Sequence, residues 1–116
     1  MENNRLIAEF MNLEKFGFKN KNYLVLGKHL SPTQLPYKTS WNWLMEVVEK
    51  IENLTDKSSS ILYDFTIFSD AVLIANQEED EIVLVNKTDA EFNTKIEATY
   101  KAIVKFIEWY NTNKKL

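Results

Sequence analysis

Apolar residues recur at the spacing of an α-helix in two long segments, residues 40–54 and 88–111. The first segment begins with Ser40, whose hydroxyl can accept an amide hydrogen of the first helical turn as an N-cap. The second begins with Thr88-Asp89-Ala90-Glu91, which has the spacing of a capping box. A shorter stripe over residues 3–13 has the same period. The chain is therefore expected to contain two long amphipathic helices and a short N-terminal helix.

Between the two long helices the pattern changes to alternation of apolar and polar residues, which is typical of strands. In residues 61–68, Tyr63 and Phe65 lie on one face and Asp64 lies on the other, which we expect to meet solvent. Short apolar runs predict further strands at residues 23–26, 71–75 and 81–85. The polar residues 77–80 indicate a hairpin loop, and such short connections favour antiparallel pairing.

These elements predict one α+β domain over residues 1–116. An antiparallel sheet of three to four strands would be covered by two amphipathic helices and a short N-terminal helix. No apolar run approaches the roughly 18 residues that a membrane span needs. The first ten residues lack the basic and then apolar pattern of a secretory signal. We therefore expect a cytoplasmic protein that does not enter the membrane.

The composition leaves few residues for catalysis. The chain has no cysteine, a single histidine (His29) and two glycines. These counts exclude a thiolate metal site, a cysteine nucleophile and a glycine-rich phosphate loop. No metal-ligand spacing accompanies His29, which we interpret as a loop imidazole. We expect a protein that is not an enzyme and that binds no cofactor or metal.

Charge is segregated along the chain, although the net charge is only −3. Basic residues oppose acidic residues six to three in residues 1–45, two to ten in residues 46–81 and six to four in residues 82–116. The acidic run that includes Glu78, Glu79 and Asp80 could imitate phosphates and occupy a basic groove on another protein. Alternatively, it is a solvated hairpin tip that prevents aggregation through the sheet edge.

Basic and aromatic residues are interleaved in a second segment, residues 15–23. Its candidate contact residues are Phe16, Phe18, Lys19 and Lys21. Lysines can meet phosphates while aromatic rings stack on bases. The alternative is a loop in which the phenylalanines enter the core and the lysines stay in solvent. The acidic net charge argues against strong direct binding to nucleic acid, because phosphate contacts dominate that affinity.

Two tryptophans, Trp43 and Trp109, lie at the edges of the apolar stripes of their helices. Tryptophan is enriched among the residues that contribute most to protein–protein binding. Each tryptophan could instead cover the rim of its own core. A contact through Trp109 would also allow a homodimer.

Two blocks at these tryptophans carry a resemblance to known proteins. They are Ser40-Trp41-Asn42-Trp43-Leu44-Met45 and Phe106-Ile107-Glu108-Trp109-Tyr110-Asn111. With the first helix, they resemble a group of small accessory proteins of phages and prophages in Bacteroidetes. The motif residues are mostly core positions, so the resemblance implies no catalytic residues. It implies a phage-derived protein that acts in the cytoplasm of a bacterial host cell.

Small accessory phage proteins often inhibit host defences, including CRISPR nucleases, so the resemblance suggests an anti-CRISPR type of inhibitor by analogy. We therefore expect a non-catalytic protein that binds and inhibits a host defence component, with a ribonucleoprotein CRISPR effector as the candidate partner. Two alternatives stay open. One is a nucleotide-sequestering protein with a pocket lined by Tyr63, Tyr100 and nearby lysines. The other is an interaction module that forms a homodimer.

Overall fold

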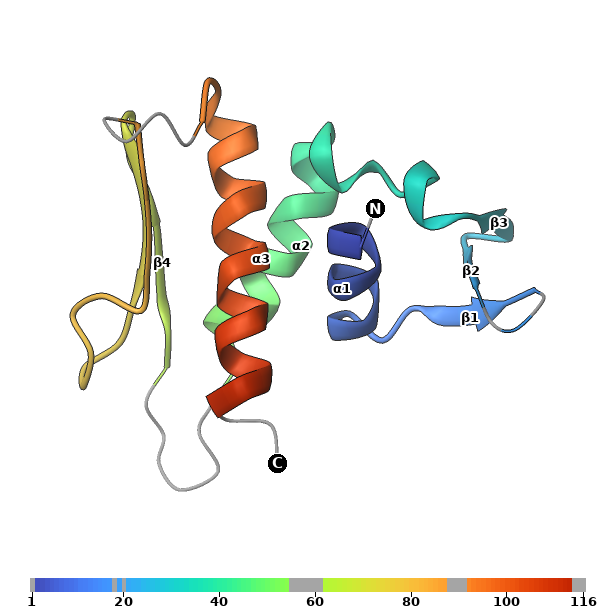
Figure 1. Cartoon of the computed structure of the whole chain (residues 1–116), viewed down its shortest axis with the longest axis horizontal. Coiled ribbons are helices and arrows are strands. Elements are labelled where there is room, and N and C mark those ends of the chain that lie inside the picture. The colour runs from blue at the N-terminus through green and yellow to red at the C-terminus, as the bar shows by residue number, and fades with distance from the viewer. Residues whose placement is uncertain (1, 18, 20, 55–61, 88–91, 114–116) are drawn as a thin grey trace.

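The computed structural model describes residues 2–17, 19, 21–54, 62–87 and 92–113, and it confirms the α+β class (Figure 1). Its helices are α1 (Glu2–Phe10), α2 (Trp41–Glu52) and α3 (Lys95–Asn113), with the short 3-10 turns η2 (Pro32–Gln34) and η3 (Pro36–Lys38). One sheet contains β1 (Glu14–Phe16), β2 (Asn22–Val25) and β3 (Lys28–Leu30), and the other contains β4 (Asp64–Ile67), β5 (Ala71–Ala75) and β6 (Val83–Asn86). No described helix is long and apolar enough to span a bilayer.

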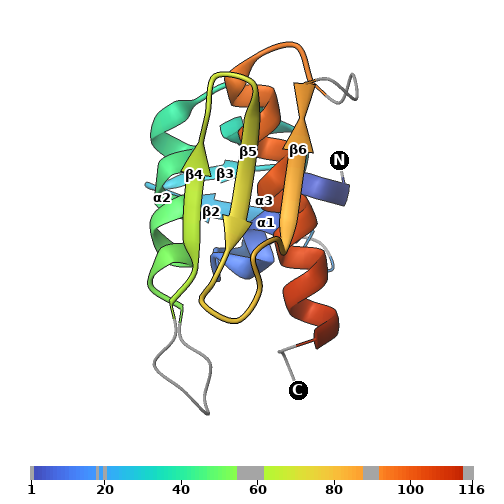
Figure 2. The same ribbon diagram turned by 90° about the vertical axis from the view of Figure 1, so that its left-hand side faces the viewer.

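The larger sheet is an antiparallel meander in the order β4-β5-β6, and helices α2 and α3 cover one of its faces (Figures 1 and 2). Val72, Ile74 and Val85 point into this layer and are fully buried. The predicted alternation in β4 is confirmed, because Tyr63 is buried and Asp64 is exposed. The opposite face of the sheet carries no helix (Figure 2).

The prediction of a single sheet is wrong, because the strand at Tyr23 does not join the meander. Strand β2 instead lies between β1 and β3 in a small sheet of its own. The physical reason is local: Leu26 and Gly27 form a two-residue turn that folds β3 back onto β2. Gly17, with a positive φ of 89°, bends the chain after β1. Strand β2 is therefore paired on both edges by its nearest neighbours in sequence.

Helix α3 starts later than predicted, because residues 92–94 are not helical. The amide of Glu97 donates to the hydroxyl of Thr94 at 3.2 Å, and the Glu97 carboxylate accepts the amide of Asn93 at 3.0 Å. The helix thus begins with a Thr-x-x-Glu cap six residues after the predicted one. Residues 88–91, which hold the predicted cap, lie outside the described residues. The helical ion pair expected from the spacing, Glu97 with Lys101, is present at 3.7 Å.

Helix α1 ends at Phe10, three residues before the predicted end. Asn12 has a positive φ of 58°, and the amides of Asn12 and Leu13 donate back to the carbonyls of Glu9 and Ala8. This is the hydrogen-bond pattern of a Schellman motif with asparagine in the left-handed position. The motif turns the chain out of the helical core and directs it toward β1.

A buried polar network ties α1 to the rest of the core. Asn4 is 5% exposed, and its amide nitrogen donates to the carbonyls of Pro32 at 2.8 Å and Leu35 at 3.2 Å. Its side-chain oxygen accepts the hydroxyl of Tyr100 at 2.7 Å. One side chain therefore connects α1, the 3-10 turns and α3 through hydrogen bonds that are shielded from water.

Candidate contact surfaces

The small sheet projects from the helices as an arm, which we define as residues 14–30 (Figure 1). All three residues of β1 are exposed. The arm is anchored at its root by Tyr23, which is fully buried. The Arg5 guanidinium donates to the Tyr23 hydroxyl and to the Lys21 carbonyl, both at 3.4 Å. Burial raises the pKa of Tyr23 above its usual value, although the nearby Arg5 opposes this shift. The arm thus has a fixed base and an open outer part.

The most unusual residue of the arm is Leu26. It is 95% exposed, and its φ of 50° lies in the left-handed region. Together with Gly27, at a φ of 79°, it forms the two central positions of the β2–β3 turn. A turn with two positive φ values favours asparagine and glycine, because a leucine Cβ crowds the backbone there. Stability alone would therefore disfavour a leucine at this position.

An apolar groove of about 170 Å³ lies beside this turn. Its lining comes from the end of α1, the arm, η3 and α2, and it comprises Met11, Leu13, Val25, Leu26, Tyr37, Trp43 and Glu46. The ring of Trp43 packs edge-to-face on Tyr37, with 5.2 Å between the centroids. Burial, and to a smaller extent the charge of Glu46, raises the pKa of Tyr37. The structure thus brings Trp43, which is half-buried, next to the arm.

The other predicted residues of the arm lie on its outer surface. Phe16 is 41% exposed and stacks on His29, with 3.6 Å between the ring centroids. Lys19 and Lys21 are both exposed, and Phe18 lies outside the described residues. The nearest carboxylate to Lys15 is that of Glu9, at 3.9 Å. The arm therefore presents a basic surface that surrounds an exposed aromatic pair.

The acidic residues Glu78, Glu79 and Asp80 are exposed in the loop between β5 and β6, at the far end of the molecule from the arm (Figure 1). The side-chain oxygen of Asn76 accepts the amides of Glu78 at 2.9 Å and Glu79 at 2.7 Å. This local turn gives the loop a defined shape. The basic and acidic surfaces predicted from the sequence therefore do not form one site.

Trp109 is half-buried, with its ring 6.1 Å from that of Tyr63 and 5.8 Å from that of Phe106. Both packing partners belong to the core of its own chain. A role of Trp109 in partner binding or in a homodimer stays a prediction. The more exposed residues of α2 are Trp41, at 40%, and Met45, at 39%.

The two tyrosines that were candidates for a nucleotide pocket are not brought together. Tyr63 packs edge-to-face against Phe106, with 5.0 Å between the centroids. Tyr100 instead lines a hollow of about 320 Å³ with Asn3, Lys38, Glu97 and Lys101. The Lys38 ammonium lies 5.5 Å from the centre of the Tyr100 ring and occupies one side of it. Only one tyrosine of the predicted pair therefore contributes to this hollow.

Among the described residues, no group of three histidine, aspartate or glutamate side chains is arranged to hold a metal ion. Comparisons with family models, with curated proteins and with solved structures returned no match to this chain. The argument for function therefore depends on the surfaces themselves. Sequence reasoning missed Leu26, and the available signal was a Leu-Gly pair between two short stretches rich in β-branched and aromatic residues.

Proposed function

We propose that this protein is a non-catalytic inhibitor that acts by binding, with the arm as its main contact with a host defence protein. The observation that carries the proposal is Leu26, an apolar side chain held 95% exposed in a left-handed turn. Exposed apolar surface and backbone strain both cost stability, and such costs concentrate at functional sites. An apolar anchor that enters a recess on a partner would offset both costs on binding.

The chemistry of the arm defines the kind of partner that it fits. Lysines at positions 15, 19, 21 and 28 outnumber the single carboxylate of Glu14 in the described part of the arm. The groove beside Leu26 is apolar apart from Glu46 and the tyrosine hydroxyl. The complementary surface is a protein with an apolar recess for Leu26 and acidic side chains around it.

The resemblance to phage and prophage accessory proteins supplies the biological context of this proposal. A phage protein that acts by contact alone needs a stable scaffold and a projecting surface, and both are compatible with the arm and its helical base. We therefore propose a host defence complex as the target, with a CRISPR effector as the leading candidate. In this view the arm contacts a protein subunit and does not bind RNA.

Charge reversal distinguishes the arm from the acidic loop. The tagged protein is used to capture its target from host lysate at physiological salt. Changing Lys15, Lys19 and Lys21 together to glutamate should abolish capture, because like charges would then face the acidic rim of the partner. The matched control is the change of Glu78, Glu79 and Asp80 to lysine, which should leave capture intact. All six residues are exposed, so each change should alter stability by less than about 0.5 kcal/mol.

Three outcomes would contradict the proposal. Loss of capture in the acidic-loop variant alone would assign the contact to that loop. Loss after nuclease treatment of the lysate would mean that the arm grips a nucleic acid. Recovery of no defence component by the parent protein would remove the defence target from consideration.

A further inference from the structure

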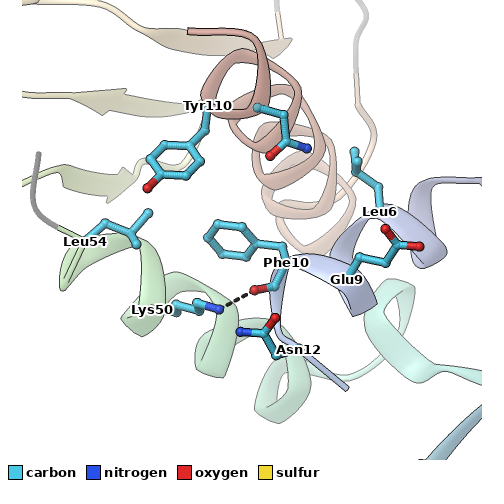
Figure 3. A pocket seen from close by; sticks show the side chains of 8 residues that line it. Leu6, Glu9, Phe10, Asn12, Lys50, Leu54 and Tyr110 are labelled. Atoms are coloured by element: carbon cyan, nitrogen blue, oxygen red, sulfur yellow. Dashed lines mark hydrogen bonds between the residues drawn. The ribbon is translucent and has the colours of Figure 1, made fainter. Parts of the chain in front are cut away.

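The ends of the three helices enclose a second hollow, of about 260 Å³, on a different part of the molecule from the arm groove. Its lining comprises Leu6, Glu9, Phe10, Asn12, Lys50, Leu54, Tyr110 and Asn111. Figure 3 shows Phe10 at its centre, with Lys50, Leu54 and Tyr110 toward one side and Leu6 and Glu9 toward the other. The rings of Phe10 and Tyr110 meet edge-to-face, with 6.2 Å between the centroids. Apolar walls thus surround a small number of polar groups, as in many small-ligand sites.

Lys50 is the cation of this hollow. Its ammonium donates to the backbone carbonyl of Phe10 and lies 4.7 Å from the centre of the Phe10 ring (Figure 3). Within the described residues, no carboxylate lies within ion-pair distance of it. Burial lowers the pKa of Lys50, since its charged form is partly removed from water without a counter-charge. An ammonium has three N–H donors, so the Phe10 carbonyl leaves two for another acceptor.

We propose that this hollow binds a small amphiphilic monocarboxylate, whose carboxylate pairs with Lys50 and whose apolar body packs on Phe10 and Leu54. A carboxylate supplies two acceptor oxygens and the missing counter-charge, and charge-assisted bonds of this kind are stronger than neutral ones. The ligand carries a single negative charge, because the Glu9 carboxylate on the opposite side of Phe10 would repel a second. The site is independent of the arm and of the proposed inhibitory function.

The test uses phenylacetate as the probe and phenylacetamide as its uncharged counterpart. Amide spectra of isotope-labelled protein are recorded by NMR during titration with each compound. Phenylacetate should shift the signals of the hollow, including those of Lys50 and Tyr110, in a saturable way. Phenylacetamide should bind at least about tenfold more weakly, since it cannot form the charge-assisted bond to the ammonium.

Variants locate the charge that is responsible. Lys50→Met keeps most of the length of the side chain and should weaken phenylacetate binding about tenfold or more, whereas Lys50→Arg should retain it. Lys87→Met removes an exposed lysine elsewhere and should have no effect. Equal binding of the acid and the amide to the parent protein would overturn the proposal, even if no variant folded. Absence of saturable shifts would also overturn it, because Lys50 would then serve only to cap the end of α1.

Discussion

Replacing Asn4 with alanine should lower the free energy of unfolding by about 3 kcal/mol. The change removes three buried hydrogen bonds and leaves the carbonyls of Pro32 and Leu35 and the hydroxyl of Tyr100 without their partner. An abandoned buried polar group costs about 1 kcal/mol or more, and these three lie in separate elements that no single rearrangement can satisfy. The loss would remove a large part of the stability of a domain of this size.

Urea unfolding followed by circular dichroism measures this effect. The matched control is Asn3→Ala, since Asn3 is the preceding asparagine of the same helix but is exposed, and its loss should cost less than about 0.5 kcal/mol. Tyr100→Phe removes only one of the three bonds and should cost about 1 kcal/mol. If Asn4→Ala unfolded at the same urea concentration as the control, the network would not hold the helices together.

Replacing Leu26 with asparagine should make the protein more stable and weaken its binding to the target. Asparagine adopts positive φ more readily than leucine and precedes glycine in the preferred sequence of this turn. With the exposed apolar side chain also removed, the free energy of unfolding should rise by about 0.5–1 kcal/mol. Target affinity should fall at least about thirtyfold, because residues that anchor an interface contribute about 2 kcal/mol or more.

The opposite signs make this variant informative, because a residue that served only the fold would not produce them. Leu62→Asn is the control: Leu62 is 48% exposed but precedes β4 on the larger sheet, far from the arm. Its replacement should leave the dissociation constant unchanged. Unchanged affinity in Leu26→Asn would show that Leu26 is not the anchor, and a lower stability would show that the leucine supports the turn.

The helices and the larger sheet could be predicted because their signals are periodic. The hydroxyl of Ser40 accepts the Trp43 amide at 3.4 Å, as an N-cap should, and β5 has the predicted bounds of residues 71–75. Burial repeats at 3.6 residues in a helix and at two in a strand, so the order of apolar residues reveals both. Exposure of Glu78, Glu79 and Asp80 followed equally from the placement of a hairpin loop.

The arm could not be predicted because its strands have little burial to impose a pattern. Strand β1 consists of Glu14, Lys15 and Phe16, all exposed, and β3 has a single half-buried residue, Leu30. Their pairing depends on the turn at Leu26, where the residue types are not those that the turn prefers. The start of α3 was misplaced for a different reason: Thr88 and Thr94 are both followed by a glutamate three residues later, and local spacing cannot rank two such caps.

Stoichiometric titration tests the central claim most directly, namely that the protein inhibits by binding and not by catalysis. The defence complex captured from the host is purified, and its nuclease activity is measured at increasing amounts of this protein, at complex concentrations well above the dissociation constant. We expect activity to fall linearly and to reach its minimum at a fixed stoichiometric equivalent, without further change over time. Progressive loss of activity at substoichiometric amounts would contradict the account, because it would require turnover, and so would full activity at saturating amounts.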